Sequence, residues 1–265
     1  MSQIQKSSAY PWALTGVFAA IHFIITIIPF SISVGIEGVI SFGLISAPII
    51  GFLLGPLYGT LAVIIGTTLG MFANPAIGTI LGPFTPLAPA SAALVAGAIR
   101  MGRPQISFLI YLSGTVLFVI GPIFLQAGIF LWLHIIALII SMIFIIPQVG
   151  RLLYEGVTPT TESNFTFRIL PFLIMAFIAV MTDQLIGSVI GVYYFIYIQL
   201  VPAEVIAPFY VSVAFLYPIE RIIATFIVAP ICILVSKAIK NENLILPTIP
   251  YVDRISELGQ EESNL

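Results

Sequence analysis

Long apolar stretches alternate with short polar, proline-rich or glycine-rich gaps along most of this chain. The stretches are continuously apolar, and several approach the ~20 residues that a helix needs to cross the hydrocarbon core of a bilayer. Strands of an outer-membrane barrel would be shorter and would alternate in polarity. The pattern therefore predicts an all-α, polytopic membrane helical bundle. We expect about eight helices, near Trp12–Phe30, Gly43–Leu54, Leu57–Met71, Leu87–Ile99, Ile106–Ile120, Ile129–Ile146, Ile169–Tyr197 and Phe209–Ala238.

The gaps carry turn and breaker residues. Gly55-Pro56 predicts a tight turn between the second and third helices, and Gly121-Pro122 predicts a break after the fifth. The proline- and glycine-rich segment Phe72–Pro86 is too irregular to span, so we expect it to fold over protein or at the surface. We interpret Tyr154–Phe167 as a polar loop and Ile198–Pro208 as a turn.

Composition supports a membrane bundle. Of 265 residues, 60% are hydrophobic and 8% are charged, which leaves too little polar surface for a soluble domain. We expect one transmembrane domain over residues 1–240 and a polar cytoplasmic tail over 241–265. The single cysteine, Cys232, excludes an internal disulfide and a cysteine-based metal site. The first apolar run has no cleavage-site pattern, so we interpret it as a retained helix.

The basic residues predict the orientation. Eight spans with both termini in the cytoplasm would place eight of the nine basic residues on the cytoplasmic side of the plasma membrane, where Lys and Arg are retained. Six or seven spans are possible if the fifth and sixth helices are re-entrant or fused, but seven spans would break the charge pattern. The eight flanking residues are Lys6, Arg100, Arg103, Arg151, Arg168, Lys237, Lys240 and Arg254.

The ninth basic residue, Arg221, lies inside an apolar run, and Asp183 lies inside another. Asp183 is ~22 Å along its helix from Arg168, and Arg221 is ~24 Å from Lys237. The two therefore reach similar depths on antiparallel helices, which predicts an ion pair. Such a pair either ties the helices together or lines a polar cavity for a solute. Glu220 points about 100° away from Arg221.

Motifs for other classes of protein are missing. His22 and His134 have no second ligand at helical spacing, so we expect helix contacts and no metal site. The chain has no HExxH, Walker A or GxSxG motif, which argues against an enzyme or a self-contained ATP-driven pump. We expect no cofactor and no nucleic-acid partner.

Two segments carry a resemblance to a known family. Leu53–Gly59, which reads Leu-Leu-Gly-Pro-Leu-Tyr-Gly, and the small-residue stretch Ile65–Gly70 resemble the turn between the second and third helices of substrate-binding (S) components of energy-coupling factor transporters. Tyr217–Arg221 resembles their final helix, and Ala13–Pro29 is similar in texture to their first. Those components have six helices. The resemblance therefore implies a six-helix core in which Ile106–Ile120 and Ile129–Ile146 form an inserted hairpin.

The resemblance implies a membrane subunit that binds a vitamin-like small organic solute and works with a coupling transmembrane subunit and two ATPase subunits. Because two carboxylates accompany one Arg, a neutral or zwitterionic solute fits better than an anionic one. The N-terminal Met-His arrangement of metal-transporting members is replaced here by Met-Ser-Gln, which disfavours nickel or cobalt. The implied solute-binding residues are Glu37, Asn74, Asp183, Gln184, Glu220 and Arg221, and the implied coupling-subunit contacts are Thr15, Gly16, Ala19 and Ala20.

Two other classes of function stay open at this point. A stand-alone secondary transporter would use Asp183 or Glu220 to carry a proton, as intramembrane carboxylates do in proton relays. An intramembrane enzyme or assembly factor is the third possibility, although the glycine-aspartate motif of intramembrane aspartyl proteases is absent.

Overall fold

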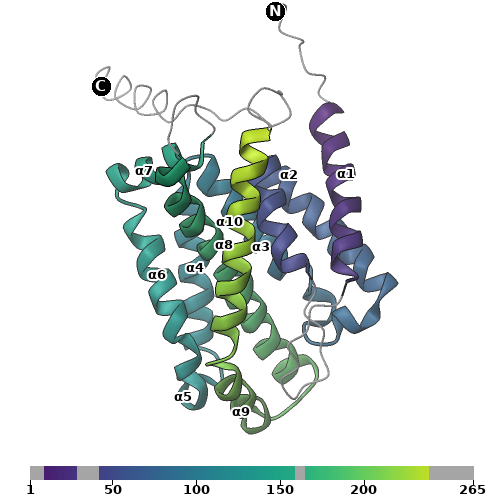
Figure 1. Cartoon of the computed structure of the whole chain (residues 1–265). Helices are drawn as coiled ribbons and strands as arrows, with labels where there is room; N and C mark the ends of the chain where they lie inside the picture. Colours follow the sequence, from purple (N-terminus) through teal and green to yellow (C-terminus); the bar gives the residue numbers. More distant parts are fainter. Residues whose placement is uncertain (1–8, 29–41, 159–164, 239–265) are drawn as a thin grey trace, which may run out of the picture.

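The computed structural model describes residues 9–28, 42–158 and 165–238, and within them every regular element is a helix (Figure 1). Short 3-10 segments, η1 (Pro75–Gly78), η2 (Gly82–Phe84) and η3 (Gly128–Leu131), and a π-helical turn, η4 (Tyr194–Ile198), join the α-helices. The α-helices are α1 (Ala9–Thr26), α2 (Gly43–Ala73), α3 (Leu87–Arg100), α4 (Pro104–Val119), α5 (Phe124–Ala127), α6 (Trp132–Ile143), α7 (Pro147–Val157), α8 (Phe165–Tyr193), α9 (Ala203–Val213) and α10 (Tyr217–Ala238).

Six helical segments of the described chain are long and apolar enough to cross a membrane, which makes this a multi-pass membrane protein. Two further apolar helices, Pro104–Val119 and Ala203–Val213, are shorter. The all-helical membrane bundle is therefore confirmed, and the count of eight spans stays a prediction. The six segments are Ala9–Thr26, Gly43–Ala73, Gly82–Arg100, Phe124–Ile143, Ile169–Ile198 and Tyr217–Lys237.

Helix α2 folds back on itself at Gly55-Pro56, as the sequence predicts. Gly55 adopts φ 79°, a left-handed conformation that glycine accepts without strain. A methyl group added to Gly59 would lie 2.7 Å from the Cα atom of Gly51. Residues eight apart on a straight helix are separated by ~12 Å. Residues 43–54 and 57–73 are therefore two arms of a tight helical hairpin.

Arg100 stabilises this turn. Pro56 has no N–H, and the break at Gly55 frees the last carbonyl groups of the first arm. The Nη1 atom of Arg100 donates to the carbonyl oxygens of Phe52 and Leu53, at 2.7 Å for Leu53. The Arg100 side chain is buried and also lies over the Phe52 ring. The sequence predicts only an orienting role for Arg100. In the structure, Arg100 also replaces the backbone donors that the turn removes.

Small residues let two helices, α1 and α3, approach the α2 hairpin closely. A methyl group on Gly51 would lie 2.0 Å from the Ala93 oxygen of α3, and one on Gly66 would lie 2.6 Å from the Ala19 oxygen of α1. His22 of α1 bonds both arms of the hairpin. Its ring nitrogens lie 2.7 Å from Ser46 Oγ and 2.9 Å from Thr67 Oγ1, so the expected helix-contact role of His22 is confirmed.

Apart from Arg221, the basic residues of the described chain gather toward one end of the bundle. Helix α1 begins and α10 ends at this end, where α7 also lies (Figure 1). Lys237 is in the last turn of α10, and Arg151 is in α7. A methyl group on Gly150 of α7 would lie 3.3 Å from Pro104, which follows Arg103 directly. This grouping is what a retained cytoplasmic face requires.

Two predicted boundaries are wrong. The interval interpreted as a loop, Tyr154–Phe167, begins inside α7, whose amphipathic sequence buries Leu153 and Val157 against the bundle. The predicted last helix, Phe209–Ala238, is divided into α9 and α10, and α9 begins inside the predicted turn. Pro218 lies in the first turn of α10, where proline starts a helix because no N–H is needed there.

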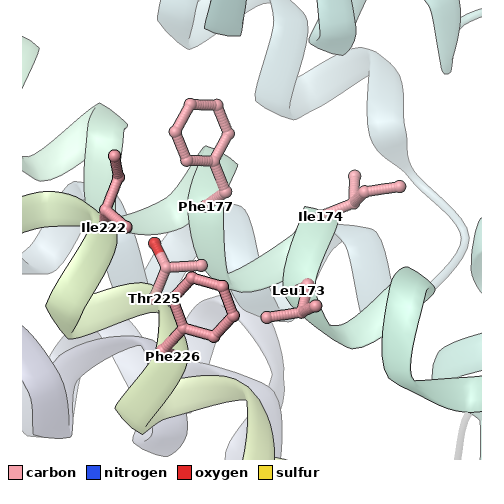
Figure 2. A pocket seen from close by; sticks show the side chains of 6 residues that line it. All are labelled: Leu173, Ile174, Phe177, Ile222, Thr225 and Phe226. Carbon is pink, nitrogen blue, oxygen red and sulfur yellow. The ribbon is translucent and has the colours of Figure 1, made fainter. Parts of the chain in front are cut away.

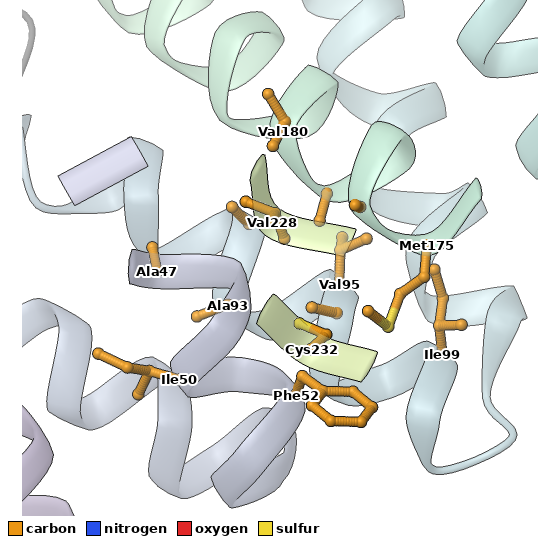
Figure 3. Close-up of a cluster of buried hydrophobic side chains, with 14 of the residues drawn as sticks. Ala47, Ile50, Phe52, Ala93, Val95, Ile99, Met175, Val180, Val228 and Cys232 are labelled. Atoms are coloured by element: carbon orange, nitrogen blue, oxygen red, sulfur yellow. The ribbon is translucent and has the colours of Figure 1, made fainter. Parts of the chain in front are cut away.

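The interior is formed by two apolar clusters that share α8 and α10. One lies among α2, α3, α8 and α10 and includes Phe52, Val95, Met175, Val228 and Cys232 (Figure 3). The second contains aromatic side chains from α4, η3, α9 and α10 that pack against α8. Helices α8 and α10 are therefore the axis around which both halves of the bundle assemble.

We predict that Arg100→Lys destabilises the protein by about 1.5–3 kcal/mol, because an ammonium group cannot reproduce the guanidinium contacts with the buried turn. Thermal unfolding in detergent measures the change. Arg103→Lys, at an exposed position one turn away, is the matched control and should stay within about 0.5 kcal/mol. Equal effects of the two substitutions would contradict this role of Arg100.

We also predict that Gly51→Ala destabilises the bundle by about 1–3 kcal/mol, because the added methyl group meets the Ala93 backbone. Gly16→Ala is the control, since its methyl group meets nothing within 4 Å and alanine favours helix. Unfolding of both variants by a denaturing detergent compares them. A Gly51→Ala protein as stable as Gly16→Ala would show that the hairpin and α3 are not in close contact.

Candidate functional site

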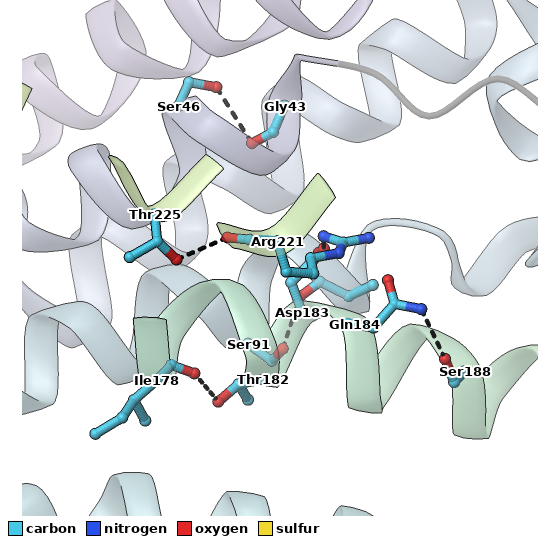
Figure 4. Close-up of polar contacts among 11 residues, drawn as sticks. Gly43, Ser46, Ser91, Ile178, Thr182, Asp183, Gln184, Ser188, Arg221 and Thr225 are labelled. Atoms are coloured by element: carbon cyan, nitrogen blue, oxygen red, sulfur yellow. Dashed lines mark hydrogen bonds and ion pairs between the residues drawn. The ribbon is translucent and has the colours of Figure 1, made fainter. Parts of the chain in front are cut away.

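The predicted ion pair between α8 and α10 is confirmed. Arg221 Nη1 lies 2.7 Å from Asp183 Oδ2, and the side chains are 5% and 10% exposed (Figure 4). In both helices a neighbouring hydroxyl bonds back to its own backbone. Thr182 donates to the Ile178 carbonyl, and Thr225 donates to the Arg221 carbonyl. Because both side chains are almost fully enclosed, each charge depends on the other for its stabilisation.

The pair lies at the junction of the two apolar clusters. On α8, Val180 belongs to the first cluster, and Met181 and Leu185 belong to the second. On α10, Tyr217 belongs to the second cluster and Ala224 to the first. Asp183 and Arg221 therefore replace apolar contacts at the place where the two halves of the bundle meet. A buried pair at such a position costs desolvation energy and is weak evidence for stability alone.

A second carboxylate lies beside the pair. Glu220 is 5% exposed, and among the described residues it has no hydrogen-bond or ion-pair partner. Gln184 follows Asp183 and is half-buried, and its Nε2 donates to Ser188 Oγ at 3.3 Å. The predicted residues Asp183, Glu220 and Arg221 are thus all buried, and Gln184 adjoins them on α8.

An aromatic group at the start of α10 was not predicted. The His134 ring stacks on the Tyr217 ring, with centroids 5.2 Å apart and planes at 14°. His134 Nδ1 lies 2.7 Å from the Tyr111 hydroxyl, and Tyr217 donates to the Phe130 carbonyl at 2.9 Å. Tyr217 precedes Arg221 by one helical turn, so this group borders the ion pair. Helices α4 and α6 therefore contribute to the candidate site.

The structure does not place the two remaining predicted solute contacts, Asn74 and Glu37, with the ion pair. Asn74 follows α2, and its side-chain oxygen accepts from the Ala76 N–H, which caps η1. Glu37 lies outside the described residues. Asn74 is half-buried. Its contact with a solute stays a prediction.

The four predicted coupling-subunit contacts divide into two pairs. Thr15 and Ala19 are buried within the chain, and Ala19 packs against Gly66 of α2. Gly16 and Ala20 are exposed. Only 22% of the α1 span is buried, the smallest share among the six candidate spans. The outward face of α1 thus contains Gly16 and Ala20.

Gly187 and Gly191, one helical turn apart on α8, allow close contacts with α3 and α9. A methyl group on Gly187 would lie 3.3 Å from the Ala88 side chain of α3, and one on Gly191 would lie 3.0 Å from the Tyr210 hydroxyl of α9. Tyr210 donates to the Ser188 carbonyl at 2.8 Å. These contacts fix the C-terminal half of α8 against its neighbours.

A shallow groove opens between α8 and α10 near the ion pair (Figure 2). It contains none of the predicted site residues, and only Thr225 contributes a polar side chain, whose hydroxyl already bonds to Arg221. An apolar groove of this kind suits lipid and does not suit a polar solute. Its lining consists of Leu173, Ile174, Phe177, Ile222, Thr225 and Phe226.

Within the described parts of the chain, no three His, Cys, Asp or Glu side chains gather as metal ligands would. The candidate site instead combines an ion pair, a second carboxylate and a histidine. These are hydrogen-bonding groups suited to recognising a polar organic molecule.

Comparison with known proteins gives one informative match. Uncharacterized protein MJ0923 of Methanocaldococcus jannaschii is 33% identical over 177 residues, which are 67% of this chain and 54% of the relative. The chain thus spans about half the length of the relative it matches, whose name assigns no activity. No family model and no solved structure matches the chain.

We predict that Arg221→Met destabilises the protein by about 3–5 kcal/mol, because it leaves Asp183 as a buried charge without its partner. The double variant Asp183→Leu, Arg221→Met should regain most of that loss, since it removes both desolvation costs. Denaturant unfolding of the single and double variants gives the coupling energy. Additive effects would contradict a direct, buried ion pair.

Proposed function

We propose that this protein is the membrane-embedded solute-binding subunit of a multisubunit, ATP-driven importer for a vitamin-like small organic solute. The observation that carries the proposal is the buried Asp183–Arg221 pair with Glu220 beside it. Ionisable groups at membrane depth are costly, and they usually mark a substrate path. Apolar residues would join α8 and α10 at less cost, so a structural tie alone does not account for three charged groups.

The arrangement of helices supports an importer subunit with partners. Because the α2 hairpin provides two arms, we propose eight membrane segments, counting α4 with the six candidate spans. The end where the basic residues gather is then cytoplasmic, and both termini lie there. Gly16 and Ala20 on the exposed face of α1 suit close packing by a helix of a coupling transmembrane subunit. Two ATPase subunits would complete the assembly.

A second candidate function rests on Glu220. A buried carboxylate without a partner can take up and release a proton, as carriers require. In a stand-alone proton-coupled transporter, Glu220→Gln would abolish uptake without preventing solute binding. Uptake in that case would collapse with a protonophore and survive depletion of ATP. Uptake through the ATP-driven importer would instead survive the protonophore and stop when ATP is depleted.

We predict that the tagged protein, purified in mild detergent from its native membranes, carries ATPase subunits, a coupling protein and a small organic molecule. Mass spectrometry identifies the proteins and the molecule released on denaturation. The double variant Asp183→Leu, Arg221→Met should fold and retain the protein partners but release no solute.

Two outcomes would overturn this proposal. A wild-type protein without partner subunits would remove the importer assignment and favour the proton-coupled carrier. A double variant that releases as much solute as wild type would show that the ion pair is only a tie between α8 and α10.

A further inference from the structure

Two buried side-chain nitrogens at the candidate site lack hydrogen-bond partners among the described residues. They are His134 Nε2 and Arg221 Nε. Leaving a buried donor unsatisfied costs its full desolvation penalty, and native interiors contain few such groups. Two such groups beside one ion pair therefore require an explanation.

The two nitrogens belong to neighbouring side chains. The His134 ring stacks on Tyr217, which lies one helical turn before Arg221 on the same face of α10. As whole residues, His134 and Arg221 are at most 4% exposed, so bulk water does not satisfy them.

The hydrogen bond to Tyr111 determines what His134 offers. If the Tyr111 hydroxyl donates to Nδ1, Nε2 carries the hydrogen and only that N–H is left without an acceptor. The opposite tautomer would leave both the tyrosine O–H and the Nε2 lone pair unmet. The first arrangement is therefore favoured, and His134 Nε2 and Arg221 Nε are both donors. A carboxylate supplies the acceptor oxygens that two such donors need.

Glu220, in contrast, is an acceptor that needs a hydrogen-bond donor or a cation. Glu220 is a buried residue that directly precedes Arg221, and within the described chain its carboxylate makes no hydrogen bond or ion pair. Asp183 already neutralises Arg221, so the three charges sum to a net negative charge. A ligand carrying only a carboxylate would add to this charge, whereas a ligand that also carries an ammonium group would give Glu220 its partner.

We propose that the site binds a zwitterionic solute, with its carboxylate on His134 Nε2 and Arg221 Nε and its ammonium group toward Glu220. This inference rests on the proposed function and specifies the chemical class of its solute. Asp183 then holds the guanidinium in place through Nη1, which leaves Nε for the solute. Helix α6 supplies His134, so the inserted hairpin takes part in recognition.

Ligand-dependent thermal stabilisation of the purified protein tests this assignment. The probes are 4-aminobutanoate and 2-aminobutanoate, compared with butanoate, butylamine and butanamide at equal millimolar concentrations. A ligand that binds the folded state raises the unfolding temperature according to its affinity. We expect at least one amino acid to bind about tenfold or more tightly than the three single-ended probes.

Variants assign each end of the probe to its residue. Arg221→Lys keeps a positive charge beside Asp183 but lacks the Nε donor, and His134→Phe keeps a ring beside Tyr217 but lacks both nitrogens. Each should remove the preference for the carboxylate-bearing probes. Glu220→Gln should reduce binding of the amino acid to that of butanoate. Arg100→Lys, which alters a buried arginine at the α2 turn, should leave the order of the probes unchanged.

The possible failures can be distinguished. Stabilisation by butanamide alone, or amino-acid binding that survives Arg221→Lys and His134→Phe, would overturn the zwitterion assignment and leave a solute-binding subunit in place. Absence of stabilisation by either amino acid would also overturn the assignment. If the native protein released no small molecule as well, the proposed function would fall with it.

Discussion

The cost of placing charge at membrane depth governs the centre of this bundle. Asp183 and Arg221 lie 2.7 Å apart between two largely apolar helices, at the junction of both interior clusters. Removing either partner would leave a charge with neither water nor a counter-ion. The pair therefore fixes how α8 and α10 face each other, and this in turn positions Tyr217, His134 and Glu220 around it.

The same constraint applies to the backbone. A turn of the chain inside an apolar bundle must find partners for the carbonyl groups that it frees. Arg100 satisfies the break at Gly55-Pro56, and closely packed glycines allow α1 and α3 to enclose the resulting hairpin. His22 then joins both arms through Ser46 and Thr67. These contacts tie together the half of the bundle that contains the hairpin, and the polar centre lies where this half meets the other.

The sequence predicts features that depend on local chemistry or on simple helix geometry. The all-helical membrane class follows from the apolar runs, the hairpin turn follows from Gly55-Pro56, and the Asp183–Arg221 pair follows from counting residues to the basic ends of the helices. It does not predict the end of α7 or the division of α9 from α10, because packing and a starting proline decide those boundaries. The stacking of His134 on Tyr217 joins residues 83 positions apart, and no local pattern records that contact.

The central claim is that a charged centre buried between α8 and α10 receives a solute from the face opposite the basic end of the bundle. Cysteine accessibility tests it most directly. Cys232, the single native cysteine, is replaced by serine, and Gln184→Cys places one thiol beside Asp183. The account predicts that a membrane-impermeant thiol reagent reacts from the face opposite the basic residues and that bound amino acid blocks the reaction. Reaction only from the basic face, or no reaction from either face of the folded protein, would contradict it.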